Sequence, residues 1–148
     1  MKRISLRVLL AIVLPGMFVL FAAGYIGCNG VIASGVALGR EFKIRYVQEL
    51  TVKGQDLKVK FASLLDDSRC PEGVECFWEG DARILIGVSQ ATVEEAHMEL
   101  HTSRGGGETE GRYQHYVIRL VALYPNRPKY HGNIKPSNYV ATLLVTKD

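Results

Sequence analysis

The segment LKVKFASL, from Leu57 to Leu64, alternates apolar and polar side chains. Successive side chains of a strand point to opposite faces, so this alternation predicts a β-strand with one face in a core and the other in water. A turn signal, Gly54-Gln55-Asp56, precedes the segment. Similar patterns on both sides of it extend the same prediction to most of the chain.

Five further segments are typical of strands, and no long amphipathic helix accompanies them. The helix formers of Thr92–His101 leave that segment ambiguous, but Ala96, Met98 and Leu100 share one parity, which favours a strand. In Tyr113–Leu123 the same reasoning places Ala122 on the inner face. The remaining predicted strands are Phe42–Val52, Ala82–Val88 and Tyr139–Thr146.

About six to eight strands at this spacing predict an all-β fold, a single small β-sandwich or barrel of immunoglobulin-like size. The glycine-rich segment Ser103–Gly111 is expected to form a hairpin tip. Pro125, Pro128 and Pro136 are expected to hold the following segment as a coil.

The N-terminal residues 1–28 are typical of a signal peptide or membrane-anchor helix. Lys2, Arg3 and Arg7 precede twenty residues without a charged side chain, Val8 to Gly27. Such a segment inserts with its positive end inside, so the rest of the chain is expected to be translocated. Residues 29–40, rich in Gly, Ala and Ser, are expected to be a flexible tether, and residues 41–148 an extracytoplasmic β domain.

Three fates of the N-terminal segment stay open. In the first, cleavage before Cys28 is followed by lipidation of that cysteine, as in a bacterial lipoprotein. In the second, the segment remains as an uncleaved anchor, and in the third it is cut after a small-x-small site such as Ala37-Leu38-Gly39. Lipidation would also account for the odd cysteine of the three, which is a liability in an oxidising compartment.

The segment DSRCPEGVECFWEG, from Asp67 to Gly80, holds the other two cysteines and the only tryptophan. Pro71 and Gly73 between Cys70 and Cys76 favour a tight reversal. We therefore expect a Cys70–Cys76 disulfide, which stabilises the fold by about 2 kcal/mol in the chain-entropy model.

The residues around this disulfide are expected to act as structural elements. Asp67 is expected to accept backbone hydrogen bonds at the start of the loop. Arg69 is expected to pair with Asp66 or Asp67, or to cover an aromatic face. Trp78 is expected to pack beside the disulfide in the core.

This run also resembles the signature of a family of bacterial secreted proteins and lipoproteins whose activity is unknown. The matching positions lie within Asp67–Ala82, and the resemblance extends over about Phe42 to Val145. Phe77 and Glu79 differ from the residues expected there, which are aliphatic and small. The resemblance implies an extracytoplasmic β domain with a disulfide, and it supplies no activity.

The segment between Tyr124 and Tyr139 is the most plausible contact surface, because aromatic rings mixed with hydrogen-bonding groups suit recognition. Alternatively, it crosses between strands with its tyrosines packed on the rim. The possible ligand contacts are Tyr124, Tyr130, His131, Asn133 and Tyr139.

No catalytic residue, metal site or cofactor is expected. The spacing of the two cysteines differs from the Cys-x-x-Cys of redox sites. The sequence also contains no Gly-x-Ser-x-Gly elbow, and no phosphate-binding or dinucleotide-binding glycine pattern. The formal charge of +3 comes from the N-terminal segment, since the remainder carries 15 basic and 15 acidic residues. A nucleic-acid partner is therefore not expected.

The function expected from these features is a non-enzymatic interaction or accessory domain of the bacterial cell envelope. It would be held at the membrane through its N-terminal segment or a lipid, and its partner would be an envelope protein. One alternative is a periplasmic protein that binds a small ligand or a metal ion. Another is a secreted protease inhibitor that presents the stapled loop in a pre-organised form.

Overall fold

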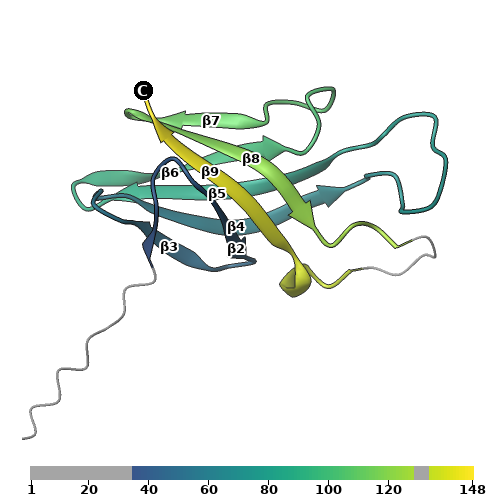
Figure 1. Ribbon diagram of the computed structural model, residues 1–148, viewed down its shortest axis with the longest axis horizontal. Helices are drawn as coiled ribbons and strands as arrows, with labels where there is room; N and C mark the ends of the chain where they lie inside the picture. The colour runs from purple at the N-terminus through teal and green to yellow at the C-terminus, as the bar shows by residue number, and fades with distance from the viewer. Residues whose placement is uncertain (1–34, 129–133) are drawn as a thin grey trace, which may run out of the picture. The chain divides into compact units, whose positions relative to one another are not determined.

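The computed structural model describes residues 35–128 and 134–148, which form two β-sheets packed face to face (Figure 1). The all-β fold predicted from the sequence, a single small sandwich or barrel, is confirmed. Residues 1–28, with the predicted anchor helix and Cys28, lie outside the described residues. No helix within the described part has the length and apolar character needed to cross a membrane.

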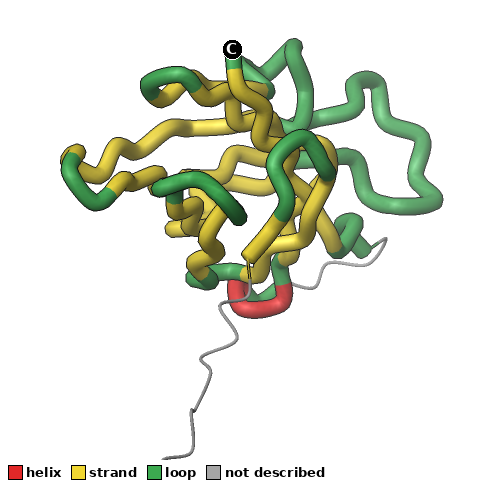
Figure 2. Tube along the Cα trace, turned by 60° about the vertical axis from the view of Figure 1, so that its left-hand side comes forward, coloured by secondary structure: helices red, strands yellow, loops and turns green. Residues whose placement is uncertain are grey.

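The first sheet has the strand order β1-β3-β4-β5-β6, antiparallel except for the parallel pair β1 and β3. Its strands are β1 (Gly35–Val36), β3 (Glu49–Val52), β4 (Lys58–Asp67), β5 (Ala82–Gln90) and β6 (Val93–His101). The second sheet is antiparallel and has the order β2-β9-β8-β7. Its strands are β2 (Glu41–Arg45), β7 (Glu110–Tyr113), β8 (Tyr116–Tyr124) and β9 (Val140–Lys147). A 3-10 turn, Pro136–Asn138, precedes β9 and is drawn in red in Figure 2.

The core lies between the sheets and is built by the alternation seen in the sequence. Val59 and Phe61 of β4 are completely buried, whereas Lys58 of the same strand points the other way and is exposed. Phe61 packs its ring against the edge of Tyr46 at a centroid distance of 5.7 Å. Leu143 and Val145 of β9 complete the core from the second sheet. Burying a side chain of this size contributes about 1.5–3 kcal/mol.

The predicted strand Phe42–Val52 is in fact two strands in different sheets. A turn at Tyr46–Gln48 carries the chain from β2 in the second sheet to β3 in the first. Its central residue, Val47, has a φ of 55°, a conformation that a β-branched side chain disfavours. No local pattern of strand breakers marks this turn, so the periodicity alone suggested one continuous strand.

The predicted tether is shorter than expected, because residues 35–40 belong to the fold. Gly35 and Val36 pair with Thr51 and Val52 of β3. The amide of Gly39 donates to the carbonyl of Val145, 2.8 Å away. Apolar side chains of this segment pack against the core, and this packing outweighs the flexible composition.

The prediction of a strand at Thr92–His101 is confirmed by β6, where Leu100 is buried and Ala96 and Met98 pack against the core. The glycine-rich segment after it is not a hairpin tip, since it connects β6 of the first sheet to β7 of the second. The predicted strand Tyr113–Leu123 is interrupted by a turn before Tyr116.

Because the register shifts in β8, the prediction that Ala122 faces the core is wrong. The pairing with β9 moves by one residue between Leu120 and Ala122. Leu123, only 3% exposed, therefore takes the core position that the period of two assigned to Ala122. A bulge of this kind reverses the faces of all later residues.

The strained turn predicts a stabilising substitution. Val47 is 59% exposed, so it contributes little to the core. Replacing Val47 with Asn, which tolerates positive φ better than a β-branched residue, should raise the free energy of unfolding by about 1 kcal/mol. Urea denaturation measures this change, and Val47→Ile, which keeps the branched Cβ, serves as control. A Val47→Asn protein no more stable than the control would contradict the assigned conformation.

Candidate functional site

The loop between β4 and β5 begins with a buried ion pair. The guanidinium of Arg69 donates two parallel hydrogen bonds to the carboxylate of Asp67, from Nε to Oδ1 at 2.8 Å and from Nη2 to Oδ2 at 2.7 Å. The two side chains are only 15% and 6% exposed. The backbone amide of Arg69 also donates to Asp67 Oδ1 at 3.3 Å. The predicted roles of Asp67 and Arg69 therefore both appear in one motif.

Arg69 also fastens this loop to the other sheet. Its Nη1 donates to the carbonyl of Leu123 at 2.6 Å and its Nη2 to that of Pro125 at 2.8 Å. Arg127 returns a hydrogen bond from its own Nη1 to the carbonyl of Arg69 at 2.9 Å. Because Leu123 and Pro125 lie at the end of β8, one guanidinium connects the two sheets where both segments leave them.

Tyr139 closes the network from the start of β9. Its hydroxyl donates to Asp67 Oδ2 at 2.8 Å, and its side chain is buried. Burial alone would raise the pKa of Asp67, but hydrogen bonds from Arg69 and Tyr139 together with the positive charge of Arg69 lower it below 3.8. Burial and the hydrogen bond to the Asp67 carboxylate raise the pKa of Tyr139 to about 12.

The ion pair predicts a large and pH-dependent loss of stability on neutralising Asp67. The Asp67→Asn protein leaves Arg69 buried without its counter-charge, which should cost about 3 kcal/mol at pH 7. Because folding lowers the pKa of Asp67 below 3.8, its contribution is complete above that pH and disappears as the pH falls further. Chemical denaturation at several pH values between 7 and 2 should therefore show the free energy of unfolding of the unsubstituted protein falling towards that of the Asp67→Asn protein.

The neighbouring carboxylate offers a matched control for that measurement. Asp66 is exposed, so Asp66→Asn should change the free energy of unfolding by less than about 0.5 kcal/mol. Equal losses from the two substitutions would contradict the special position of Asp67.

The Tyr139 hydroxyl is expected to give the opposite pH dependence, because its contribution to stability is lost at high pH and not at low pH. Tyr139→Phe removes one hydrogen bond to a charged acceptor and should cost about 1.5 kcal/mol at pH 7. Because folding raises the pKa of Tyr139 from 10.0 to about 12, its contribution is complete below pH 10 and is lost as the pH rises towards 12. The Tyr139→Phe protein should lack this alkaline loss, whereas Tyr46→Phe, a control at the rim of the core, should keep it. Identical alkaline unfolding of all three proteins would argue against the bond.

Beyond the ion pair, the loop is closed by the Cys70–Cys76 disulfide, with Cα atoms 6.0 Å apart. Its two limbs are hydrogen-bonded to each other, from the amide of Cys70 to the carbonyl of Glu79 and from that of Ser68 to Asp81, each at 2.7 Å. A side chain at Gly80 would collide with the Ser68 backbone. The loop is therefore a clamped structure that projects past the ends of β4 and β5 (Figure 1).

The tip of this clamped loop carries two aromatic side chains in water. Trp78 is 77% exposed and Phe77 is fully exposed, so the prediction that Trp78 packs in the core beside the disulfide is wrong. The reason is that Arg69, Pro125 and Tyr139 already occupy the base of the loop. Val74, at 40%, is exposed on the same loop.

A hollow of about 470 Å³ lies beside Trp78. Its polar rim is organised by Asp81, whose Oδ1 accepts from the amides of Thr102 and Ser103 at 3.0 Å and whose Oδ2 lies 2.6 Å from His101 Nδ1. Although burial opposes it, these hydrogen bonds lower the pKa of Asp81. The residues lining the hollow are Ser68, Trp78, Glu79, Gly80, Asp81, Ser103, Gly105 and Gly106. The disulfide loop and the glycine-rich segment therefore meet here.

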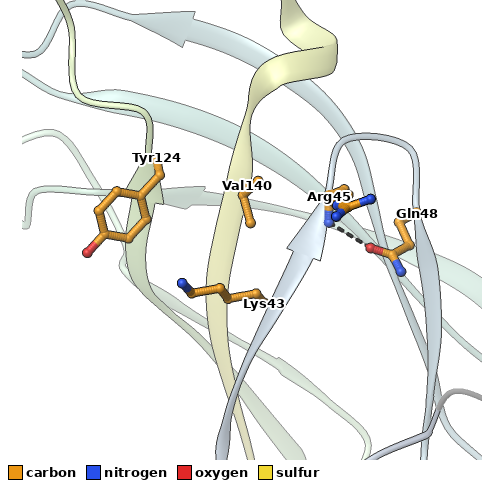
Figure 3. Close-up of a pocket in the computed structure, with 5 residues that line it drawn as sticks. All are labelled: Lys43, Arg45, Gln48, Tyr124 and Val140. Atoms are coloured by element: carbon orange, nitrogen blue, oxygen red, sulfur yellow. Dashed lines mark hydrogen bonds between the residues drawn. The ribbon is translucent and has the colours of Figure 1, made fainter.

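Of the five predicted ligand contacts, Tyr124 and Tyr139 lie within the described residues, and these two do not share one surface. Tyr139 is buried in the ion-pair network, whereas Tyr124 is 49% exposed on the outer face of the second sheet. Tyr124 lines a second hollow, of about 580 Å³, shown in Figure 3. Tyr130, His131 and Asn133 lie outside the described residues.

Several participants were missed by sequence reasoning. Arg127 stands in a proline-rich coil, where nothing local indicates a partner 58 residues away in the chain. Asp81 does carry a signal, since it directly precedes a strong strand and could be expected to bind neighbouring backbone amides. Within the described residues, no three His, Cys, Asp or Glu side chains are grouped so that they could hold a metal ion.

No protein-family model, curated protein or solved structure matches the chain.

Proposed function

We propose that this protein is a non-enzymatic interaction domain of the bacterial cell envelope that binds an envelope protein through Phe77 and Trp78. The observation that carries this proposal is the exposure of two large aromatic side chains on a disulfide-closed loop. Tryptophan is among the residues that most often dominate protein–protein binding energy, and phenylalanine is enriched in the cores of interfaces.

The clamp beneath the tip supports this role. Binding through a mobile loop loses affinity to the ordering of that loop, whereas a loop already fixed binds with a smaller entropic cost. Here the disulfide, the hydrogen-bonded limbs and the Asp67–Arg69 pair order the loop before any partner arrives. Glu72 and Glu75 are exposed around the tip and would form the polar rim of the interface.

The location is part of the same proposal. A disulfide is stable in an oxidising compartment, and the positively charged, apolar residues 1–28 are expected to direct export. Lipidation of Cys28 would tether the domain to the membrane and leave its aromatic loop free to reach a neighbouring envelope protein.

Photo-crosslinking in the source cells tests the proposal on the full chain. A benzoylphenylalanine at position 77 should give one dominant protein adduct. Trp78→Ser should weaken formation of that adduct at least about tenfold, as for the loss of an interface hot spot. Cys70→Ser combined with Cys76→Ser should weaken it as well, because the tip loses its pre-organisation.

The same photo-reactive residue at position 93, where Val93 is 37% exposed on the edge strand β6, provides the control. Identical adducts from positions 77 and 93, or none from position 77, would contradict the proposed interface. An adduct that maps to the active-site cleft of a protease would replace the accessory role with that of an inhibitor.

A further inference from the structure

The hollow on the outer face of the second sheet is lined by two cationic side chains, Lys43 and Arg45, together with Gln48, Tyr124 and Val140. Arg45, Val140 and Tyr124 stand in one row across β2, β9 and β8, because Arg45 pairs with Val140 and Val140 with Tyr124. Lys43 lies two residues before Arg45 on the same face, and its side chain reaches over β9 towards Tyr124 (Figure 3). The volume of about 580 Å³ falls in the range typical of small-molecule sites.

The cations of this hollow are not neutralised by the protein. Neither Lys43 nor Arg45 has a carboxylate within 4.0 Å among the described residues. Five cations of the described chain do have one, Lys58, Arg69, Arg83, Arg112 and Arg119. Others, such as Lys53, Lys60 and Lys147, lack a carboxylate at this distance among the described residues, as Lys43 and Arg45 do. What distinguishes the hollow is that it brings two such cations together with no acidic residue in its lining.

The remaining polar groups of the hollow are also donors. The side-chain oxygen of Gln48 accepts from the backbone amide of Arg45 at 2.9 Å, which leaves its NH₂ group to donate elsewhere. The ammonium of Lys43 lies 5.9 Å from the centre of the Tyr124 ring, a cation–π distance. No acidic residue of the described chain lines this hollow.

The turn Tyr46–Gln48, which places Gln48 beside Arg45, contains the unfavourable backbone conformation of Val47. Val47, with its φ of 55°, stands between them, and its amide donates to the carbonyl of Phe61 at 2.8 Å. Unfavourable backbone conformations persist where the surrounding structure enforces them, and they cluster at ligand sites.

We propose that this hollow binds a phosphate group, with Lys43 and Arg45 as charge partners, Gln48 as an amide donor and the Tyr124 ring covering the group that carries the phosphate. A phosphate has more acceptor oxygens than a carboxylate and so suits several donors on separate walls. This inference goes beyond the proposed protein interface, since neither Phe77 nor Trp78 lines the hollow. A membrane phospholipid and a soluble phosphate ester share the chemistry recognised.

Amide chemical shifts of the ¹⁵N-labelled full chain in a neutral detergent test the proposal. The probes are inorganic phosphate, glycerol 3-phosphate and short-chain phosphatidylglycerol, and sodium chloride at matched ionic strength is the reference. We expect saturable shifts confined to residues around Arg45, Gln48 and Tyr124. Lys43→Gln combined with Arg45→Gln should weaken binding at least about tenfold, since two charged donors are lost.

A second pair of substitutions removes the same charge elsewhere. Lys58→Gln combined with Arg83→Gln should leave the affinity within about twofold, because these exposed cations lie on the other sheet. Tighter binding of the short-chain lipid than of glycerol 3-phosphate would assign the site to a phospholipid, and equal binding to a soluble ester. Shifts reproduced by chloride, shifts that survive Lys43→Gln with Arg45→Gln, or no saturable shift would each overturn the proposal.

Discussion

The bidentate pair between Arg69 and Asp67 determines where the disulfide loop between β4 and β5 can go. Asp67 is the last residue of β4 in one sheet, and the same guanidinium holds the carbonyls of Leu123 and Pro125 at the end of β8 in the other. The planar guanidinium makes four side-chain hydrogen bonds here, two to the carboxylate and one to each carbonyl, whereas a lysine ammonium has only three donors. Because the base of the loop is filled in this way, its aromatic residues are left outside the core.

The regular parts of the fold could be predicted from the sequence because they depend on interactions between residues that are close together in the chain. The alternation in β4 places Val59 and Phe61 inside and Lys58 outside, and the short spacing of Cys70 and Cys76 favours their pairing. Even β6, with its helix-forming residues, follows the period of two. In each case neighbouring residues carry the information.

The features that the sequence did not predict depend on distant contacts. The turn at Val47 and the bulge before Leu123 carry no breaker residues, and only packing between the sheets selects them. Trp78 is a residue type usually found in cores, and its exposure follows from long-range bonds made by Arg69. The hollow around Tyr124 joins three strands that are adjacent in space but remote in the chain.

Fluorescence of Trp78 tests most directly whether the loop is both ordered and exposed, since it is the only tryptophan of the chain. Steady-state quenching by acrylamide reports exposure, and time-resolved anisotropy reports motion of the indole relative to the domain. We expect emission and quenching close to those of free tryptophan, with anisotropy that decays mainly by tumbling of the whole domain. A blue-shifted and shielded emission, or a rapid loss of anisotropy in the oxidised protein, would contradict it.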